Sequence, residues 1–290
     1  MKNFAIYANS TRDHNYLQLH RIAGFLSSIL PYGTVSLIGD EDAVAAHKNM
    51  HGTGLNILSG DTPLHKTNCI ITLGGDGTLL RAAAVFAVPN GVPLMGINLG
   101  NIGYLTDVGI DNAESALKDL LSGNFMTEER LMLEAGSGSA NHTALNDALI
   151  TRHGNPGIMQ FIVKVNGVFM DRYRADGIIV STPTGSTAYN LSAGGPVLSP
   201  GLKALAITPI CAHALHVRSA IVSSSDIIEI TVQSSNIQAS LYTDGRFAEI
   251  VPPSSPVTIT QSPTPAKIIK TKDSGKNFYD ILRGKLCCSP

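Results

Sequence analysis

Residues 69–78 read CIITLGGDGT, a short apolar run that leads directly into a glycine-rich turn with one acidic residue. The run 69–73 is apolar apart from Thr72, which is typical of a strand buried on both faces. Residues 79–88, rich in alanine, are expected to form a helix directly after the turn. A buried strand, a tight turn and a helix in this order predict an α/β unit with parallel strands.

The same alternation continues on both sides of this stretch. Leu19, Ile22 and Leu26 recur at helical spacing, and Pro31 and Gly33 follow as helix-ending residues. We therefore predict an N-terminal α/β domain with a Rossmann-like parallel sheet over residues 1–126. Its expected strands lie at 4–8, 35–38, 69–73 and 93–97, and its expected helices at 16–30, 79–88 and 113–121.

The pattern changes after about residue 127, where short β-rich runs follow one another. Asn166-Gly167 separates two of these runs and is a strong hairpin signal. We predict a C-terminal all-β, sandwich-like domain over 127–266, followed by a strand and a helix at 267–290 that can pack back on the first domain. The expected strands are 131–134, 144–151, 159–165, 168–174, 178–181, 204–209, 227–232, 240–243 and 257–261.

Composition narrows the class of protein. The 21 Lys and Arg against 22 Asp and Glu give a net charge of −1, without the basic surplus usual in nucleic-acid binders. The cysteines, Cys69, Cys211, Cys287 and Cys288, form no CxxC pair, so we expect reduced thiols. With neither a secretory signal nor an apolar run long enough to span a bilayer, we expect a cytoplasmic protein with no membrane partner.

The turn at 74–78 is the first candidate site. Gly74, Gly75 and Gly77 allow the backbone to approach a ligand, and the N-terminus of the following helix favours phosphate. The carboxylate of Asp76 would repel phosphate. Its presence in this turn is explained if Asp76 binds magnesium or orients a hydroxyl group. The alternative is an ordinary strand-to-helix turn in which Asp76 is the helix N-cap.

Residues 176–196, DGIIVSTPTGSTAYNLSAGGP, form the second candidate site. Many hydroxyl groups and small residues are combined here with Tyr189, which offers a flat face to a nucleotide base. The alternative is a Ser/Thr-rich surface loop. The density of glycine and small residues around an aromatic ring favours a ligand site.

Two shorter motifs complete the set. Asn146-Asp147 lies in an otherwise apolar run, and polar groups buried there need partners. The alternative is that the pair marks a strand edge or a bulge. Asp244-Gly245, taken alone, is typical of a hairpin turn.

Taken in order, these motifs resemble the NAD kinase family. The resemblance covers roughly residues 70–245, and within this range the segments 98–100, 103–105 and 208–218 also match the family. It implies an α/β domain followed by a β-sandwich-like domain, and transfer of the terminal phosphoryl group of ATP to the 2′-hydroxyl of the adenosine ribose of NAD. It also implies Mg²⁺ or another divalent cation as cofactor, NAD and ATP as substrates, and a homodimer or homotetramer.

The resemblance further implies roles for individual residues. Asp76 would be the catalytic carboxylate near the ribose hydroxyl. Phosphate and ATP contacts are expected from Gly74, Gly75, Thr78, Arg81 and Arg174, with Arg218 as a further candidate for neutralising charge. NAD contacts are expected from Gly77, Asn146, Asp147, Asp176, Thr184, Thr187, Ala188, Tyr189, Ser192 and Asp244. The family usually has Asn-Glu where this chain has Asn146-Asp147, so the carboxylate is one methylene shorter.

Three other classes of protein fit the sequence less well. A lipid kinase relative would share the GGDG turn but should carry a membrane-facing surface and would not explain 176–196. A non-catalytic dinucleotide-binding protein would have no need for Asp76. A Rossmann dehydrogenase would have G-x-G-x-x-G after the first strand, near Asn9, where this chain has no glycine.

Overall fold

The computed structural model divides into two compact units. Unit 1 comprises Met1–Glu129 and Ala266–Pro290, and unit 2 comprises Arg130–Pro265. The residues that the structure describes are 3–30, 33–39, 56–58, 64, 66–101, 103–139, 141–154, 158–214, 217–233, 238–272 and 277–286. Cys287 and Cys288 lie outside them. The domain boundary expected after residue 126 falls inside strand β7 (Phe125–Arg130).

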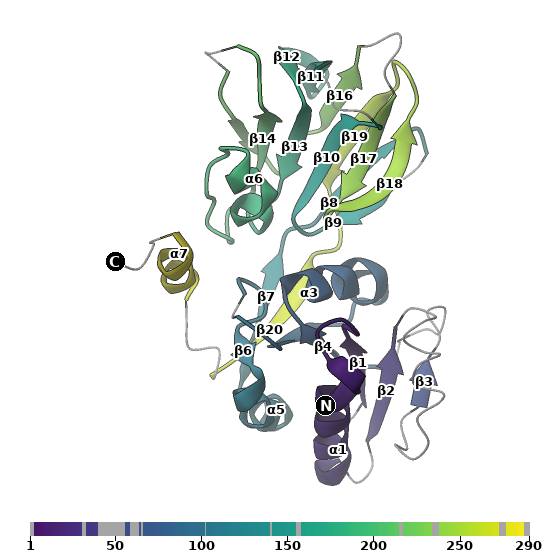
Figure 1. Ribbon diagram of the computed structural model, residues 1–290, viewed down its shortest axis with the longest axis vertical. Coiled ribbons are helices and arrows are strands. Elements are labelled where there is room, and N and C mark those ends of the chain that lie inside the picture. Colours follow the sequence, from purple (N-terminus) through teal and green to yellow (C-terminus); the bar gives the residue numbers. More distant parts are fainter. Residues whose placement is uncertain are drawn as a thin grey trace. The chain divides into compact units, whose positions relative to one another are not determined.

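Unit 1 is built on an eight-stranded sheet (Figure 1). Its strands follow the order β3-β2-β1-β4-β5-β20-β7, with β6 paired to β5, and the pairs from β3 to β20 are parallel. The remaining bounds are β1 (Asn3–Ala8), β2 (Thr34–Ile38), β3 (Asn56–Leu58), β4 (Cys69–Gly74), β5 (Leu94–Asn98), β6 (Val108–Gly109) and β20 (Ala266–Thr271).

Helices cover both faces of this sheet. On one face, α1 (Leu17–Ile29) and α5 (Ala113–Ser122) bury Leu19, Ile22 and Leu117 against strand residues such as Ile71. On the other, α3 (Asp76–Ala82) continues through a π-helical turn at Ala83–Ala87 into α4 (Val88–Asn90). Near the C-terminus, the described part of this unit also contains α7 (Phe278–Leu286). The predicted parallel α/β domain is confirmed.

The order of the strands locates the ligand-binding edge. The chain runs from β1 outward to β2 and β3, and then returns to place β4 on the opposite side of β1. Ligands of open α/β sheets bind outside the carboxyl ends of the strands at such a reversal. The GGDGT turn begins at the last residue of β4, and Asn9 directly follows β1, so both lie at the reversal between these two strands.

Unit 2 consists of two antiparallel six-stranded sheets, β15-β14-β13-β10-β17-β18 and β12-β11-β16-β19-β8-β9. Phe161 and Ile230 from one sheet share a core with Ile178 and Leu241 from the other, which confirms the predicted all-β sandwich. The strand bounds are β8 (Leu133–Ser137), β9 (His142–Ala144), β10 (Asp147–Arg152), β11 (Met159–Val165), β12 (Val168–Ala175), β13 (Gly177–Ser181), β14 (Ala204–Ile210), β15 (Ala220–Ser223), β16 (Ile228–Val232), β17 (Ala239–Thr243), β18 (Arg246–Val251) and β19 (Pro256–Gln261).

Several sequence-based element predictions need correction. The strand expected at 144–151 is interrupted, because β9 ends at Ala144 and β10 begins at Asp147. The edge strands β15 and β18 are not among the predicted strands. β15 contributes only three consecutive apolar residues, and the apolar residues of β18 are interrupted by Glu249. The helix expected from residue 79 begins at Asp76. The hairpin at Asn166-Gly167 is confirmed by positive φ angles of 51° and 76°.

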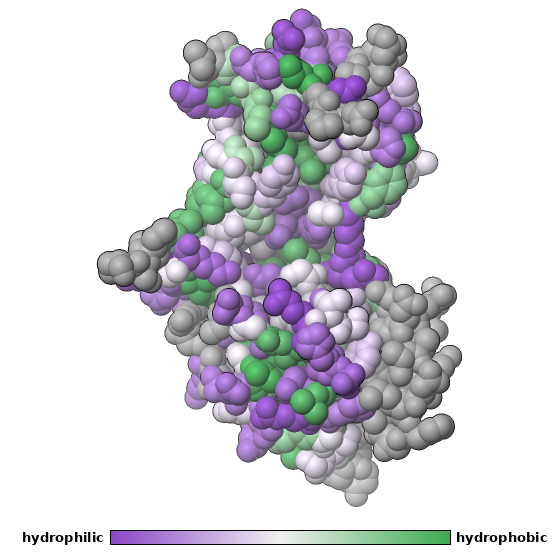
Figure 2. Space-filling view, in the orientation of Figure 1, coloured by the Kyte–Doolittle hydropathy of each residue, from purple (hydrophilic) through white to green (hydrophobic). Residues whose placement is uncertain are grey.

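The visible surface of the molecule is mixed in polarity. Hydrophilic and apolar residues are interspersed on the visible face of both units (Figure 2). Within the described residues, no helix combines the length and the apolar character needed to cross a bilayer.

Candidate active site

The glycine-rich turn leads from β4 directly into α3. Gly75, not Asp76, is the helix N-cap, so the alternative reading of Asp76 as the N-cap is wrong. Asp76 occupies the first helical position instead. A Cβ on Gly74 would lie 2.2 Å from the Thr78 hydroxyl, which shows how tightly the turn is wound. That hydroxyl also accepts a hydrogen bond from Asn9 Nδ2 at 3.1 Å.

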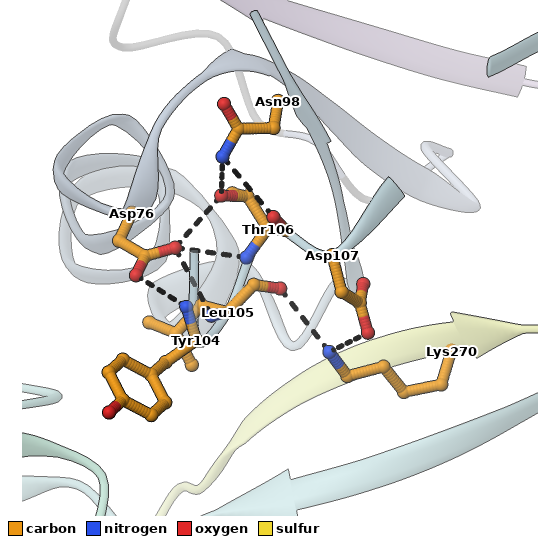
Figure 3. A network of polar contacts seen from close by, with 7 residues as sticks. All are labelled: Asp76, Asn98, Tyr104, Leu105, Thr106, Asp107 and Lys270. Carbon is orange, nitrogen blue, oxygen red and sulfur yellow. Dashed lines mark hydrogen bonds and ion pairs between the residues drawn. The ribbon is translucent and has the colours of Figure 1, made fainter. Parts of the chain in front are cut away.

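The side chain of Asp76 binds a neighbouring loop of unit 1 (Figure 3). Its Oδ2 accepts one hydrogen bond, from the Tyr104 amide at 2.8 Å. Its Oδ1 accepts three, from the amides of Leu105 (3.1 Å) and Thr106 (3.0 Å) and from the Thr106 hydroxyl (2.8 Å). Four donors from consecutive residues hold the carboxylate in one orientation at the end of β4.

The loop that binds Asp76 is itself tightly held. A Cβ on Gly103 would lie 1.9 Å from Asp76 Oδ1, so only glycine permits this approach. Asn98, at the end of β5, donates from Nδ2 to the Thr106 hydroxyl at 2.8 Å and accepts from the Gly100 amide at 2.8 Å. The motifs at 98–100 and 103–105, noted in the sequence only as family resemblance, therefore surround Asp76.

The rest of the turn has different surroundings. A Cβ on Gly75 or Gly77 would meet no atom within 4 Å in the part of the chain that the structure describes. Arg81 follows in the last turn of α3 and is half-buried. The structure thus brings Gly74, Gly75, Asp76 and Thr78 together at one strand end.

Unit 2 gathers a second set of the predicted residues around Asp244. The Asp244-Gly245 turn joins β17 to β18 with φ angles of 49° and 74°, as expected for a hairpin. The Asp244 carboxylate accepts hydrogen bonds from the amides of Leu145 (2.9 Å), Asn146 (2.7 Å) and Asp147 (3.3 Å). Asp244 therefore binds the backbone at the break between β9 and β10, where the Asn146-Asp147 motif lies.

The carboxyl groups of Asp147 and Asp244 both have raised pKa values. Burial, reinforced by the charge of Asp244, raises the pKa of Asp147 to about 7. Burial also raises the pKa of Asp244, although the three amide hydrogen bonds and Arg246 partly oppose this. Asp147 is only 5% exposed, so its ionisation is costly.

This pair predicts a pH dependence of stability. The folded protein retains the Asp147 proton between pH 4 and 7, where the unfolded chain loses it, so the free energy of unfolding falls as pH rises through this window. Asp147→Asn removes the effect and should gain on the order of 2–4 kcal/mol relative to wild type between pH 4 and pH 8.

Urea unfolding of both proteins at pH 5, 6, 7 and 8 measures this difference. The exposed Asp111 provides the control, since Asp111→Asn should run parallel to wild type. A constant difference between Asp147→Asn and wild type across the series would contradict the assignment.

The segment after β13 is organised around Asn190, which is fully buried. Its Nδ2 donates to the carbonyls of Ser186 (3.2 Å) and Pro196 (3.0 Å), and its Oδ1 accepts from the Thr208 hydroxyl at 2.7 Å. A Cβ on Gly195 would lie 2.1 Å from Asn190 Oδ1. The segment is therefore a folded support and not a loose surface loop.

Asn190→Ala should leave three buried polar groups without their partner and lower the free energy of unfolding by about 2–4 kcal/mol. Thermal unfolding of the variant measures this loss. Asn124→Ala, which truncates an exposed side chain between α5 and β7, is the control and should change stability little. An unchanged melting temperature for Asn190→Ala would show that the segment does not depend on this network.

The predicted ligand residues of this segment lie on one short stretch. Thr184 is buried, Thr187 and Ala188 are half-buried, and Tyr189 and Ser192 are exposed. The Asn146 carbonyl accepts a hydrogen bond from the Thr182 amide at 2.9 Å, which ties the segment to the Asn146-Asp147 motif.

Asp176 and Arg174 are not part of this group. Asp176 precedes β13 and Thr182 follows it, so they lie about 20 Å apart at roughly 3.3 Å per residue. Arg174 lines a cavity of about 240 Å³ together with Met159, Gln160 and Gln233. The predicted ligand contacts of Asp176 and Arg174 stay predictions. Arg218 is exposed and donates to the Val217 carbonyl at 2.8 Å.

Sequence reasoning missed Thr106, Asp107, Asn190 and Lys270. Lys270 could have been found from the sequence, because it directly follows Ile268-Ile269 in an expected strand and a buried ammonium group needs a partner. For a metal ion, the described residues contain no group of three or more His, Cys, Asp or Glu side chains placed to hold one.

A glycine-rich turn at the reversal point of a parallel sheet defines the class of α/β nucleotide-binding proteins. Residues 60–125 match the ATP-NAD kinase N-terminal domain, and residues 145–271 match the ATP-NAD kinase C-terminal domain. The chain belongs to the NAD kinase family, whose members phosphorylate NAD to NADP at the expense of ATP.

Individual relatives agree. The NAD kinase of Caldanaerobacter subterraneus subsp. tengcongensis is 35% identical over 291 residues, covering 99% of this chain and 99% of the relative. That of Carboxydothermus hydrogenoformans is 40% identical over 237 residues, covering 80% and 84%.

Solved structures give the same fold. An Archaeoglobus fulgidus NAD kinase in complex with ATP has a TM-score of 0.73 at 26% identity, covering 98% of this chain and 99% of that one. Yeast NADH kinase complexed with NADH has a TM-score of 0.84 at 24% identity, covering 100% and 89%. The predicted family and activity are confirmed, and the lipid kinase, dehydrogenase and non-catalytic alternatives are set aside.

Proposed function

We propose that Asp76 orients the 2′-hydroxyl of the adenosine ribose and accepts its proton as NAD is phosphorylated by ATP. The observation that carries this proposal is the unequal use of the two carboxylate oxygens. Oδ1 accepts three hydrogen bonds, whereas Oδ2 accepts one among the described residues. A carboxylate oxygen has about two lone pairs, so Oδ2 keeps a site for a hydroxyl donor.

The chemistry fits a fixed carboxylate of this kind. Phosphoryl transfer has a loose transition state, in which positioning and charge neutralisation matter more than the strength of the base. A carboxylate is a much weaker base than an alkoxide. Asp76 therefore aligns the hydroxyl oxygen with phosphorus and accepts the proton late, once the new P–O bond has formed.

The donor phosphates are assigned to the rest of the turn. The N-terminus of α3 supplies amides and a partial positive charge. Gly75 and Gly77 leave room for the phosphates to approach the backbone, and Gly74 makes room for the Thr78 side chain. Thr78 and Arg81 complete this group on unit 1, and Arg174 is assigned to phosphate by family resemblance. The acceptor NAD is assigned to Asn146, Asp147, Thr184, Thr187, Ala188, Tyr189, Ser192 and Asp244, with Asp176 at its other end.

Mg²⁺ is proposed as a companion of the nucleotide. Four hydrogen-bond donors surround the Asp76 carboxylate, and the described residues offer no acidic cluster as an alternative ligand set. The residues present therefore do not fit a cation held by the protein alone. A divalent cation bound to the triphosphate neutralises its charge without a dedicated protein site.

The position of the new phosphate tests the proposal. The purified chain is incubated with NAD, ATP and Mg²⁺, and the product is examined by ³¹P NMR with correlation to the ribose protons. A monophosphate coupled to the adenosine 2′ proton is expected, and 2′-deoxyadenosine NAD should not be phosphorylated. A phosphate at the 3′ position would contradict the assignment. Parallel reactions with polyphosphate as donor and NADH as acceptor define the substrate range.

A further inference from the structure

Lys270 is a charged residue buried inside the sheet of unit 1. It lies on β20 next to the apolar Ile268 and Ile269 and is only 9% exposed. Its ammonium group donates to Asp107 Oδ2 at 2.6 Å and to the Leu105 carbonyl at 3.3 Å (Figure 3). A buried ammonium is retained only with close partners, and both partners come from one short segment.

That segment is the continuation of the loop that holds Asp76. Leu105 belongs to both sets of contacts, since its amide donates to Asp76 Oδ1 and its carbonyl accepts from Lys270. Asp107 follows Thr106, which supplies two more hydrogen bonds to Asp76. One residue therefore separates the carboxylate of Asp76 from the ammonium of Lys270.

The C-terminal segment reaches the same loop a second time. On α7, Phe278 packs its ring 6.1 Å from that of Tyr104, and Lys285 lies 4.5 Å from the centre of the Tyr104 ring. The amide of Tyr104 is the donor to Asp76 Oδ2. Residues more than 160 positions away in the sequence thus contact the loop at Tyr104, Leu105 and Asp107.

We propose that Lys270 is a positioning residue for Asp76. Its bonds to Leu105 and Asp107 hold the loop so that the amides of residues 104–106 fix the carboxylate, with Oδ2 turned toward the acceptor hydroxyl. This inference rests on the proposed role of Asp76. Small displacements of a reacting group are costly, and an error of about 1 Å can reduce the rate about 100-fold.

Lys270→Met tests the proposal, because it keeps most of the side-chain volume and removes the ammonium. The turnover number should fall at least about tenfold, with KM for NAD and ATP changed less than about threefold. Amide hydrogen exchange at residues 104–106 should become at least about tenfold faster in the absence of substrates. Arg21→Met, which breaks an exposed ion pair with Glu114 on the same unit, is the matched control and should leave both unchanged.

The double variant Lys270→Met/Asp107→Asn distinguishes a positioning role of Lys270 from a purely structural role of the ion pair. This variant leaves no buried unpaired charge, so it should regain much of the thermal stability lost by Lys270→Met. The proposal expects turnover to stay low and exchange at 104–106 to stay fast, because Leu105 remains untethered. Recovery of turnover together with stability, or unchanged exchange in Lys270→Met, would overturn it.

A cycle with Asp76→Asn completes the test. In that background Lys270→Met should lower turnover less than about twofold further, because the group that it positions is already lost. An equal fractional loss in both backgrounds would overturn the proposal. Full turnover in Asp76→Asn alone would refute the proposed function instead, whereas the exchange measurement would still report whether Lys270 holds the loop.

Discussion

Asp76→Asn is expected to lower the turnover number at least about 100-fold while leaving the affinity for NAD within about threefold of wild type. Proton acceptance and alignment by a side chain typically contribute 10²–10⁴-fold, and an amide nitrogen facing the hydroxyl cannot accept its proton. Steady-state kinetics with isothermal titration of NAD measure the two quantities separately. A turnover number close to that of wild type would remove Asp76 from the chemistry.

The four hydrogen bonds to Asp76 require a control for structure. An asparagine with its oxygen at the Oδ1 position keeps three of the donors and turns its NH₂ toward the Tyr104 amide. Thr106→Val removes the hydroxyl donor and keeps the carboxylate. If weakening of the loop caused the loss of turnover in Asp76→Asn, Thr106→Val would lose a similar fraction. A loss smaller than about tenfold in Thr106→Val would assign the rest of the Asp76→Asn effect to the carboxylate itself.

Gly185→Ala is expected to weaken NAD binding at least about tenfold and to lower the free energy of unfolding by about 1–3 kcal/mol. The new Cβ would lie 2.1 Å from the Asn146 carbonyl oxygen and 2.4 Å from its carbon. These are backbone atoms that cannot rotate away. The Asn146 carbonyl also receives the Thr182 amide, so any shift separates the two predicted NAD-binding segments.

Titration calorimetry and urea unfolding follow both effects of Gly185→Ala. Gly201→Ala is the matched control, because a Cβ there would meet no atom within 4 Å of the described chain. It should bind NAD like wild type and be equally stable. Unchanged NAD affinity in Gly185→Ala would mean that the close contact of these segments does not shape the binding site.

The strong local signals in the sequence were sufficient for the architecture. The apolar run 69–73 and the glycines after it predict the strand, turn and helix, and Asn166-Gly167 predicts its hairpin, because these features depend on neighbouring residues. The half-exposed edge strand β18 was not predicted, although a hairpin at Asp244-Gly245 requires a second strand.

The contacts that complete each site depend on chain folding over long distances. Asp76 meets the amides of residues 104–106 about 30 positions away, and Lys270 meets Asp107 across 163 positions. Contacts between residues so far apart in the sequence cannot be predicted from the spacing of residue types. The sequence identified Asp76 as a residue that needs partners, but only the fold shows that the loop amides bind it. Likewise, only the fold shows that Asp244 binds the backbone amides of residues 145–147.

An assay for NADP tests most directly whether this chain phosphorylates NAD through Asp76. The purified protein is incubated with NAD, ATP and Mg²⁺, and NADP is detected with an NADP-specific dehydrogenase, with Asp76→Asn in parallel. We expect NADP from the wild type and at most about one hundredth of that rate from the variant. No NADP from the wild type, or equal rates from both proteins, would contradict it.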